Sequence, residues 1–504
     1  RPFYRSGDDR GRIYRIVRKG QAPRRVLDFT RCSTEELVSL LETPNGPQRD
    51  LVQQLLIARR DSSAVPLLEK LARTSGNPLA RLHALCTLDG LDALSSQLLR
   101  QALADRHPGV RRHAVRLAES RVADDRELLQ AALELVDDPG PKVRLQLAYS
   151  LGEWPGKAVA DALARLALRD GGDPYLTAAV MSSLNKYNLR HVLAAILRQR
   201  RHPAAAKWTR MLLSQAVAFQ DWAAVRQGLV SVFESKEDAD FAWQCDVVAA
   251  VLDALQRHRF SLERITKGET QEGARLRERI VEWTRRARSV VSDERQSVEV
   301  RQAAIGLLAR ETEGRQEDWN RLAELLSPQT PVELQRAAVR RLADLPDSAV
   351  ARLLLQRWSS SSPALRSEVL SVLLTRRPWL TALLDAIEQR QVAPADIDAR
   401  TRQSLLGYPD KTVRTRAAQL LAGSGNPDRR KVLKEYQIAL KLKGDPKRGQ
   451  AVFAKTCASC HKLDGVGHEI GPNLRSLSDR RPKSLLTSIL DPSASVDGKY
   501  VTYV

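Results

Sequence analysis

The 504-residue sequence has only five cysteines, which are too few for the disulfide scaffold that stabilises small secreted folds. Aromatic residues make up only 5% of the chain, and no apolar run approaches the length of a membrane-spanning helix. The sequence also has no Gly-rich phosphate loop, no HExxH pair and no Ser/His/Asp ordering. We therefore expect no membrane-spanning segment and no substrate-converting site in this chain.

The composition is that of a globular protein with an excess of positive charge. Hydrophobic residues make up 43% and charged residues 28%, which excludes wholesale disorder. The formal net charge is +21 and the isoelectric point is about 10.1. Such a charge is compatible with nucleic acid, an anionic membrane surface or an acidic protein partner, and also with a solvated Arg-rich surface. We expect no nucleic-acid binding, because no aromatic-rich basic platform is present.

A short pattern recurs along most of the chain; most copies begin with proline and contain an aliphatic residue followed by arginine. The prolines of the first four copies are 30, 33 and 33 residues apart, and the copies occupy residues 78–84, 108–114, 141–147 and 174–180. Further copies occupy residues 298–304, 331–338, 363–366 and 411–418. A period of this length indicates a helical repeat solenoid, in which each proline begins a helix.

This unit resembles the HEAT repeat, a pair of helices whose second helix carries a characteristic arginine. The resemblance is clear at 76–184 and 297–425 and weak across 185–296, which we interpret as divergent helical pairs. The predicted fold class is all-α, with a HEAT/armadillo-like solenoid over 33–426 and a linker helix over 427–444. Residues 1–30 instead alternate β-formers with arginines, which predicts a short strand left over from an upstream domain.

The segment that carries chemistry is Cys457-Ala-Ser-Cys460-His461, a CxxCH motif. On a helical turn two cysteines three apart face the same way, so both thiols can form thioethers with one haem, and His461 can ligate its iron. A CxxC pair can also be half of a zinc site or a redox dithiol. Neither alternative is favoured, because the chain has no second CxxC pair and no thioredoxin-like pattern around this one.

Residues 444–477 as a whole resemble a class I c-type cytochrome. The match includes Gly449 and Phe453 at the packing positions of the first helix and the Gly-Pro-Asn-Leu loop at 471–474. The resemblance implies covalent haem c on Cys457 and Cys460, with His461 as the proximal iron ligand. It also implies that the carbonyl of Pro472 accepts a hydrogen bond from that imidazole and orients it. We therefore expect a cytochrome c-like domain over 445–504.

The chain departs from the class I pattern at the sixth iron ligand. Its two methionines, Met181 and Met211, both lie in the repeats, and none follows His461. We interpret this as a domain that is incomplete at the C-terminus, with water, a histidine or an empty sixth position as the alternatives. His468 follows the motif, but in this fold its loop lies on the proximal side.

The segment 482–500 narrows the resemblance to the planctomycete-type haem-binding domain. In that family the domain follows HEAT-like repeats and a β-propeller similar to quinoprotein sugar dehydrogenases, and residues 11–16 resemble the last propeller strand. The resemblance implies that this chain is an internal piece of a longer protein outside the cytoplasmic membrane, in the periplasm or beyond. The haem would then relay electrons from a sugar or alcohol dehydrogenase domain to another carrier.

A second reading comes from another functional class. The chain would then be a HEAT-repeat scaffold for protein interactions, and the haem module would be regulatory, sensory or degenerate. The two readings differ in whether the loss of His461 stops electron transfer or leaves the main function intact.

Overall fold

The computed structural model describes residues 19–20, 27–234, 240–266, 271–310, 314–345, 347–421, 427–471, 473–477 and 480–491. These residues are helical almost throughout, and the described ranges hold no strand, only an isolated bridge between Leu463 and Val466. The predicted N-terminal strand and the last residues of the chain lie outside them. The chain divides into two compact units, Arg1–Leu212 and Leu213–Val504, with the boundary inside one helix.

The first unit is a succession of short helices. They are η2 (Phe29–Arg31), α1 (Thr34–Leu40), α2 (Gly46–Arg59), α3 (Ala64–Thr74), α4 (Pro78–Gly90), α5 (Ser96–Leu103), α6 (Pro108–Ala118), α7 (Arg126–Glu134), η3 (Leu135–Asp137), α8 (Pro141–Ser150), α9 (Lys157–Arg169), α10 (Pro174–Ser182) and α11 (Leu189–Arg198). The unit boundary falls within α12 (Ala205–Ala218).

The second unit continues in the same manner. Its helices are α13 (Trp222–Phe233), α14 (Phe241–Arg257), α15 (Glu263–Thr266), α16 (Gln271–Ser292), α17 (Val298–Ile305), α18 (Arg315–Glu324), α19 (Val332–Ala343), α20 (Ala349–Gln356), α21 (Pro363–Leu373), α22 (Arg377–Glu388), η5 (Pro394–Asp396), α23 (Ala399–Leu406) and α24 (Lys411–Leu421). After them come α25 (Pro427–Tyr436), η6 (Gln437–Lys441), α26 (Pro446–Val452), η7 (Phe453–Cys457), η8 (Leu474–Ser476) and α27 (Pro482–Leu490).

The repeated prolines begin helices because a first-turn residue has no use for a backbone N–H. Pro78, Pro108, Pro141 and Pro174 are the first residues of α4, α6, α8 and α10. The residue before the proline often caps the helix, as the side chain of Asn77 accepts from the N–H of Leu79. His107 does the same through Nδ1, at 3.1 Å from the N–H of Gly109. The recurring proline therefore marks the start of a helix through interactions within its first turn.

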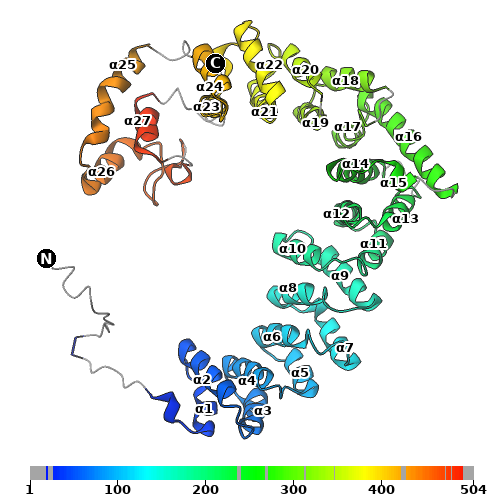
Figure 1. Cartoon of the computed structure of the whole chain (residues 1–504), viewed down its shortest axis with the longest axis vertical. Coiled ribbons are helices and arrows are strands. Elements are labelled where there is room, and N and C mark those ends of the chain that lie inside the picture. The colour runs from blue at the N-terminus through cyan, green and yellow to red at the C-terminus, as the bar shows by residue number, and fades with distance from the viewer. Residues whose placement is uncertain are drawn as a thin grey trace. The chain divides into compact units, whose positions relative to one another are not determined.

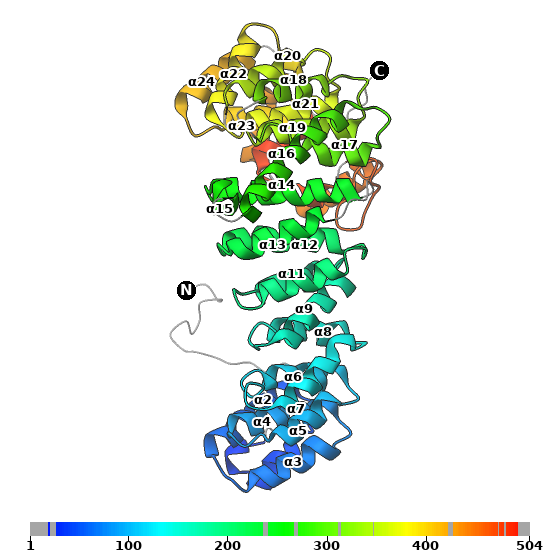
Figure 2. The same ribbon diagram turned by 90° about the vertical axis from the view of Figure 1, so that its right-hand side faces the viewer.

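Each unit is built of two layers of helices. In the first unit α2, α4, α6, α8 and α10 each pack on the next in one layer, and the other layer contains the neighbouring pairs α1 and α3, α5 and α7, and α9 and α11. In the second unit α14, α17, α19 and α21 pack in the same way. This succession is visible in Figure 1 and, from the side, in Figure 2. It confirms the predicted all-α solenoid.

A ladder of largely buried ion pairs joins successive repeats of the first unit. Each pair is bidentate, with Nε and one terminal nitrogen of an arginine both donating to a carboxylate in the loop before the next proline-initiated helix. The pairs are Arg81 with Asp105 (2.7 and 2.7 Å), Arg111 with Asp138 (2.6 and 2.8 Å) and Arg144 with Asp170 (2.7 and 2.8 Å). Bidentate geometry fixes direction as well as distance, so the ladder sets how one repeat sits on the next.

The same arginines also reach backward along the chain. The remaining terminal nitrogen donates to the carbonyl six residues upstream, and this contact recurs at Arg49 to Thr43, Arg81 to Ser75, Arg111 to Asp105, Arg144 to Asp138 and Arg414 to Tyr408. Each arginine therefore closes the turn that precedes its own helix. Arg49 shows that α2 belongs to the series, which the sequence pattern had not revealed.

From α10 of the first unit onward, the ladder does not continue unchanged. In α10 the arginine position holds Thr177, whose hydroxyl donates to the carbonyl of Asp173 instead. In α17 Arg301 donates to the carbonyl of Val291, and in α19 a glutamine, Gln335, donates to the carbonyl of Ser327. The backward contact to a preceding carbonyl is therefore more general than the ion pair.

The weakly patterned stretch 185–296 is also helical over its described residues, from α11 to α16. Two of its tryptophans, Trp208 and Trp283, are buried in the core, and the rings of Trp283 and Phe233 meet edge to face with their centres 5.1 Å apart. No helix of the described residues combines the length and apolar character that crossing a membrane would require.

Candidate haem-binding site

The helix that leads into the CxxCH motif is defined by its cap. Asp445 accepts from the N–H groups of Lys447 and Arg448 at 2.9 and 3.2 Å, and Pro446 takes the first position of α26. At its end the helix widens into the single π-turn η7, in which the N–H of Ala458 donates to the carbonyl of Phe453 at 3.0 Å. Such a π-turn shifts the register of the side chains that follow, and it commonly marks a functional position.

Cys457, Cys460 and His461 lie on one helical turn. The N–H groups of Cys460 and His461 both donate to the carbonyl of Cys457, at 3.1 and 2.9 Å. Residues three apart on such a turn share a face, so the two thiols are presented together. Both are free thiols; Cys457 is half-buried and Cys460 is exposed. The turn thus offers two thiols and an imidazole within five residues.

The loop after the motif folds back onto this turn. Leu463 and Val466 exchange backbone hydrogen bonds at 2.9 and 3.0 Å and reverse the chain. The returning backbone then donates from the N–H of His468 to the carbonyl of Ala458, and from the N–H of Gly471 to the carbonyl of Cys460, at 3.0 and 2.7 Å. The motif and its loop are therefore one hydrogen-bonded unit.

Two glycines allow this close approach. Gly467 has φ +98°, and a Cβ there would lie 2.1 Å from the carbonyl oxygen of His461. A Cβ on Gly471 would lie 2.7 Å from Cε1 and 3.0 Å from Nδ1 of the His461 ring. The imidazole is therefore seated against the loop backbone at Gly471, which fixes the ring on that side.

The surroundings of the motif also suit an apolar macrocycle. Val452, Val466, Ile470 and Ile489 are exposed apolar side chains in the same segment of the chain. Exposed apolar groups of this size can contact a haem ring, whose faces are apolar. Paired thiols on one turn, an imidazole held by a loop and apolar side chains exposed in the same segment of the chain fit a covalently attached haem.

The comparisons with known families agree with this fit. The cytochrome c family matches residues 446–502, and the HEAT repeats family matches residues 95–185. Residues 446–502 belong to a cytochrome c domain. This domain and its relatives support covalently bound haem c, with its iron, as the cofactor, so the cofactor prediction is confirmed. A cytochrome c domain also implies a redox partner.

Two relatives are similar to this chain over short stretches. A cytochrome c-553-like protein of Synechocystis is 49% identical over 45 residues, which are 9% of this chain and 42% of that protein. The cytochrome c of Ginkgo biloba is 49% identical over 39 residues, which are 8% of this chain and 34% of that protein. The chain therefore spans less than half the length of these relatives.

Two solved structures align with most of the chain. A chain from a structure of Kap95p with RanGDP covers 91% of this chain and 66% of its own length, with 11% identity and a TM-score of 0.39. The karyopherin Kap121p, bound to a C-terminal segment of the phosphatase Cdc14p, covers 84% and 48%, with 12% identity and a TM-score of 0.35. Similarities at this level carry no functional information.

The structure thus brings three of the four predicted site residues together. Cys457, Cys460 and His461 share one turn, while Pro472 lies outside the described residues. Sequence reasoning missed the role of Gly467 and the π-turn. Two glycines follow soon after the motif, at 465 and 467, and both have positive φ, +87° and +98°. Because glycine adopts such conformations most readily, this pair was the signal that could have indicated Gly467.

We expect Gly471→Ala to disturb the site without unfolding the domain. The added methyl group has to displace the His461 imidazole, so the iron ligand is tilted or lost, and the absorption spectrum of the haem and its reduction potential should both change. The matched control is Gly444→Ala in the preceding linker, where a Cβ meets nothing within 4 Å. An unaltered spectrum and potential in Gly471→Ala would show that the loop does not position the ligand.

Proposed function

We propose that this chain transfers electrons through haem c held by Cys457, Cys460 and His461. The observation that carries the proposal is the single turn that presents two thiols and an imidazole, with the returning loop seated against the imidazole at Gly471. The cytochrome c domain supports haem-based electron transfer as the general activity. Haem c supplies a reversible one-electron change at iron when it is bound.

The residues of this chain have separate tasks in that proposal. Cys457 and Cys460 form the thioethers that keep the cofactor attached, and His461 presents a ring nitrogen to the iron. Gly467 and Gly471 let the loop backbone approach the turn, which holds the imidazole in one orientation. Holding the ligand in place keeps the change of geometry between the two oxidation states small.

The finer part of the proposal is a relay. An upstream dehydrogenase domain would oxidise a sugar or an alcohol, the haem would accept the electrons, and a separate carrier would take them on. The resemblance of 482–500 to planctomycete-type haem-binding domains supports this arrangement, in which the solenoid serves as spacer and docking surface. The site of action would be the periplasm or another compartment outside the cytoplasmic membrane, where haem is attached to CxxCH motifs.

The relay is tested by comparing His461→Ala with His468→Ala in the haem-loaded parent protein. Substrate-dependent reduction of the haem, followed at its α-band, and onward reduction of a soluble c-type cytochrome should both fail in His461→Ala. They should persist in His468→Ala, because His468 is joined to the motif through its backbone N–H. Acceptor reduction at the normal rate in His461→Ala would refute the relay.

A further inference from the structure

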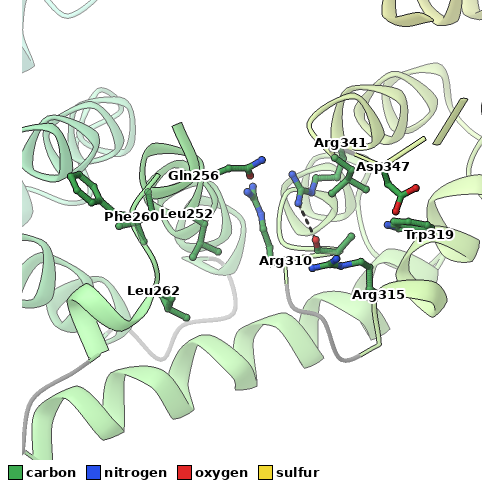
Figure 3. Close-up of a pocket in the computed structure, with 12 residues that line it drawn as sticks. Leu252, Gln256, Phe260, Leu262, Arg310, Arg315, Trp319, Arg341 and Asp347 are labelled. Atoms are coloured by element: carbon green, nitrogen blue, oxygen red, sulfur yellow. Dashed lines mark hydrogen bonds between the residues drawn. The ribbon is translucent and has the colours of Figure 1, made fainter. Parts of the chain in front are cut away.

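A pocket of about 440 Å3 lies in the second unit, where the ends of α14, α17 and α19 meet the start of α18. Its walls differ in character (Figure 3). One wall is apolar and the other carries three guanidinium groups and an indole; the residues used below are Leu252, Phe260 and Leu262 on the first, and Arg310, Arg315, Arg341 and Trp319 on the second. Pockets of this size with a few convergent polar groups are typical of small-molecule sites. We call it the arginine pocket.

Two of the three arginines are buried and held in place. The side chain of Arg310 is 7% exposed, and it donates to the carbonyl of Gly306 at 2.9 Å and to Asp253 at 2.5 Å. The side chain of Arg341 is 4% exposed, and it donates to the carbonyl of Leu308 at 2.7 Å. The positive charge is therefore preorganised in a region of low polarity, where it acts strongly on an anion.

The charge of Arg341 is poorly compensated. The carboxylate beside it, that of Asp344, is 3.5 Å away, at the limit of a hydrogen bond. Burial and the neighbouring charge of Arg310 together lower the pKa of Arg341 to about 10. A guanidinium whose protonated form is disfavoured in this way gains from an additional anion nearby.

The pocket also holds a hydrogen-bond donor that lacks an acceptor. Trp319 is 7% exposed, and its Nε1 has no hydrogen-bond partner among the residues that the structure describes. Figure 3 shows the nitrogen-bearing edge of this indole on the side of the pocket where Arg315 and Arg341 lie. Buried hydrogen-bond donors normally have an acceptor, so a ligand bound in the pocket could supply the acceptor that Nε1 of Trp319 lacks.

The opposite wall is mainly apolar, although Gln256 also lines it. Phe260 is fixed by Trp222, whose ring meets it edge-on with the ring centres 5.0 Å apart. Leu252 comes from α14 and Leu262 from the loop that follows it. This wall suits an aromatic or branched aliphatic body rather than a second charge.

Asp347 limits the charge that the pocket tolerates. Its carboxylate also lines the pocket and accepts from the N–H of Ala349 at 2.8 Å. With Asp253 and Asp344 also nearby, a doubly charged phosphate would meet repulsion that a single carboxylate largely avoids. A planar carboxylate also matches the fork of an arginine better than other anions of its charge.

We propose that the arginine pocket binds a small organic acid. The ligand's single carboxylate accepts hydrogen bonds from Arg315 and from Nε1 of Trp319. The two buried arginines, Arg310 and Arg341, attract its negative charge. Its apolar body lies against Leu252, Phe260 and Leu262. This site is independent of the haem and of the proposed electron transfer.

The test is calorimetric titration of the full chain with 3-phenylpropionate, using 3-phenylpropionamide and inorganic phosphate as comparison ligands. The acid should bind saturably, while the amide, which has the same shape without the charge, and phosphate should bind at least about tenfold more weakly. No saturable binding of the acid, or equal binding of the amide or of phosphate, overturns the proposal.

Variants place the binding in the pocket. Arg315→Gln should weaken it about tenfold or more, because a charge-assisted hydrogen bond is lost. Trp319→Phe retains a smaller aromatic ring but removes the donor and should weaken binding severalfold. The control Trp283→Phe makes the same change at another buried, unpartnered indole N–H outside the pocket and should have no effect. Leu262→Glu, on a partly exposed loop, should weaken binding by repulsion while leaving the melting temperature unchanged. Binding that none of the three pocket variants alters also overturns the proposal.

Discussion

Replacing Cys457 and Cys460 together by alanine should abolish covalent haem in a matured, exported protein. The two thiols are the only ones that the structure places on the turn beside His461, so without them no thioether can form. The measurement is haem-peroxidase staining of a denaturing gel together with a pyridine haemochrome spectrum. We expect the stained band at the chain's mass to disappear completely.

The control uses cysteines from the repeats. Cys32→Ala combined with Cys86→Ala removes two other free thiols and should leave the stained band and the c-type spectrum intact. Each single replacement in the motif should leave one thioether and a weaker band. A haem-staining band of full strength in the double variant of the motif would show that the cofactor is held elsewhere, and the electron-transfer proposal would fall with it.

The second large effect concerns the ladder of ion pairs. Asp138→Ala should destabilise the first unit by roughly 3–5 kcal/mol, because it leaves the Arg111 guanidinium buried without its carboxylate. Its neighbour Asp137 provides the control, since its side chain is 61% exposed against 3% for Asp138. Asp137 pairs with Arg165 and Arg169 at the surface, so Asp137→Ala should cost no more than about 1 kcal/mol.

Hydrogen exchange of α6 and α8, which Asp138 joins, would localise this effect in a protein with two units. Faster exchange confined to these helices and their neighbours is expected for Asp138→Ala. Equal exchange in the Asp137 and Asp138 variants would show that the buried pair adds no stability.

The same pair makes the stability depend on pH. Burial alone would raise the pKa of Asp138, but the Arg111 guanidinium and the N–H of Gly140 outweigh it and hold the pKa below its ordinary 3.8. A carboxyl whose pKa is lowered by folding stabilises the protein above its unfolded-state pKa, and this contribution is lost as the pH falls through the folded value. Asp138→Asn should therefore be less stable at neutral pH and lose less stability on acidification below about pH 4.

The repeat architecture was predictable because it is encoded locally. Prolines at helix starts and stripes of aliphatic residues recur at a regular period in the sequence. Each of them determines structure within a single helix. The ion-pair partners were not predictable in this way. Asp105, Asp138 and Asp170 lie 24 to 27 residues after their arginines, and their burial depends on how two repeats pack.

The haem site also has one part that the sequence predicts and another part that it does not. CxxCH specifies two thiols and an imidazole by spacing alone, so Cys457, Cys460 and His461 could be assigned from the chain. The position of the imidazole could not be predicted from this spacing. It depends on the fold of the following loop, in which the N–H of Gly471 donates to the carbonyl of Cys460. The arginine pocket was also invisible, since its residues come from three separate helical pairs.

The ladder has a consequence for how such a chain changes length over evolution. Each arginine of the ladder contacts the aspartate that closes its own interval and a carbonyl just before its own helix. Excising residues 106–138 would leave Asp105 in the place of Asp138, so that Arg81 keeps its partner and Arg144 finds an equivalent carbonyl. Whole units can therefore be lost or duplicated without breaking the ladder at the junction, which lets the protein lengthen or shorten in single steps.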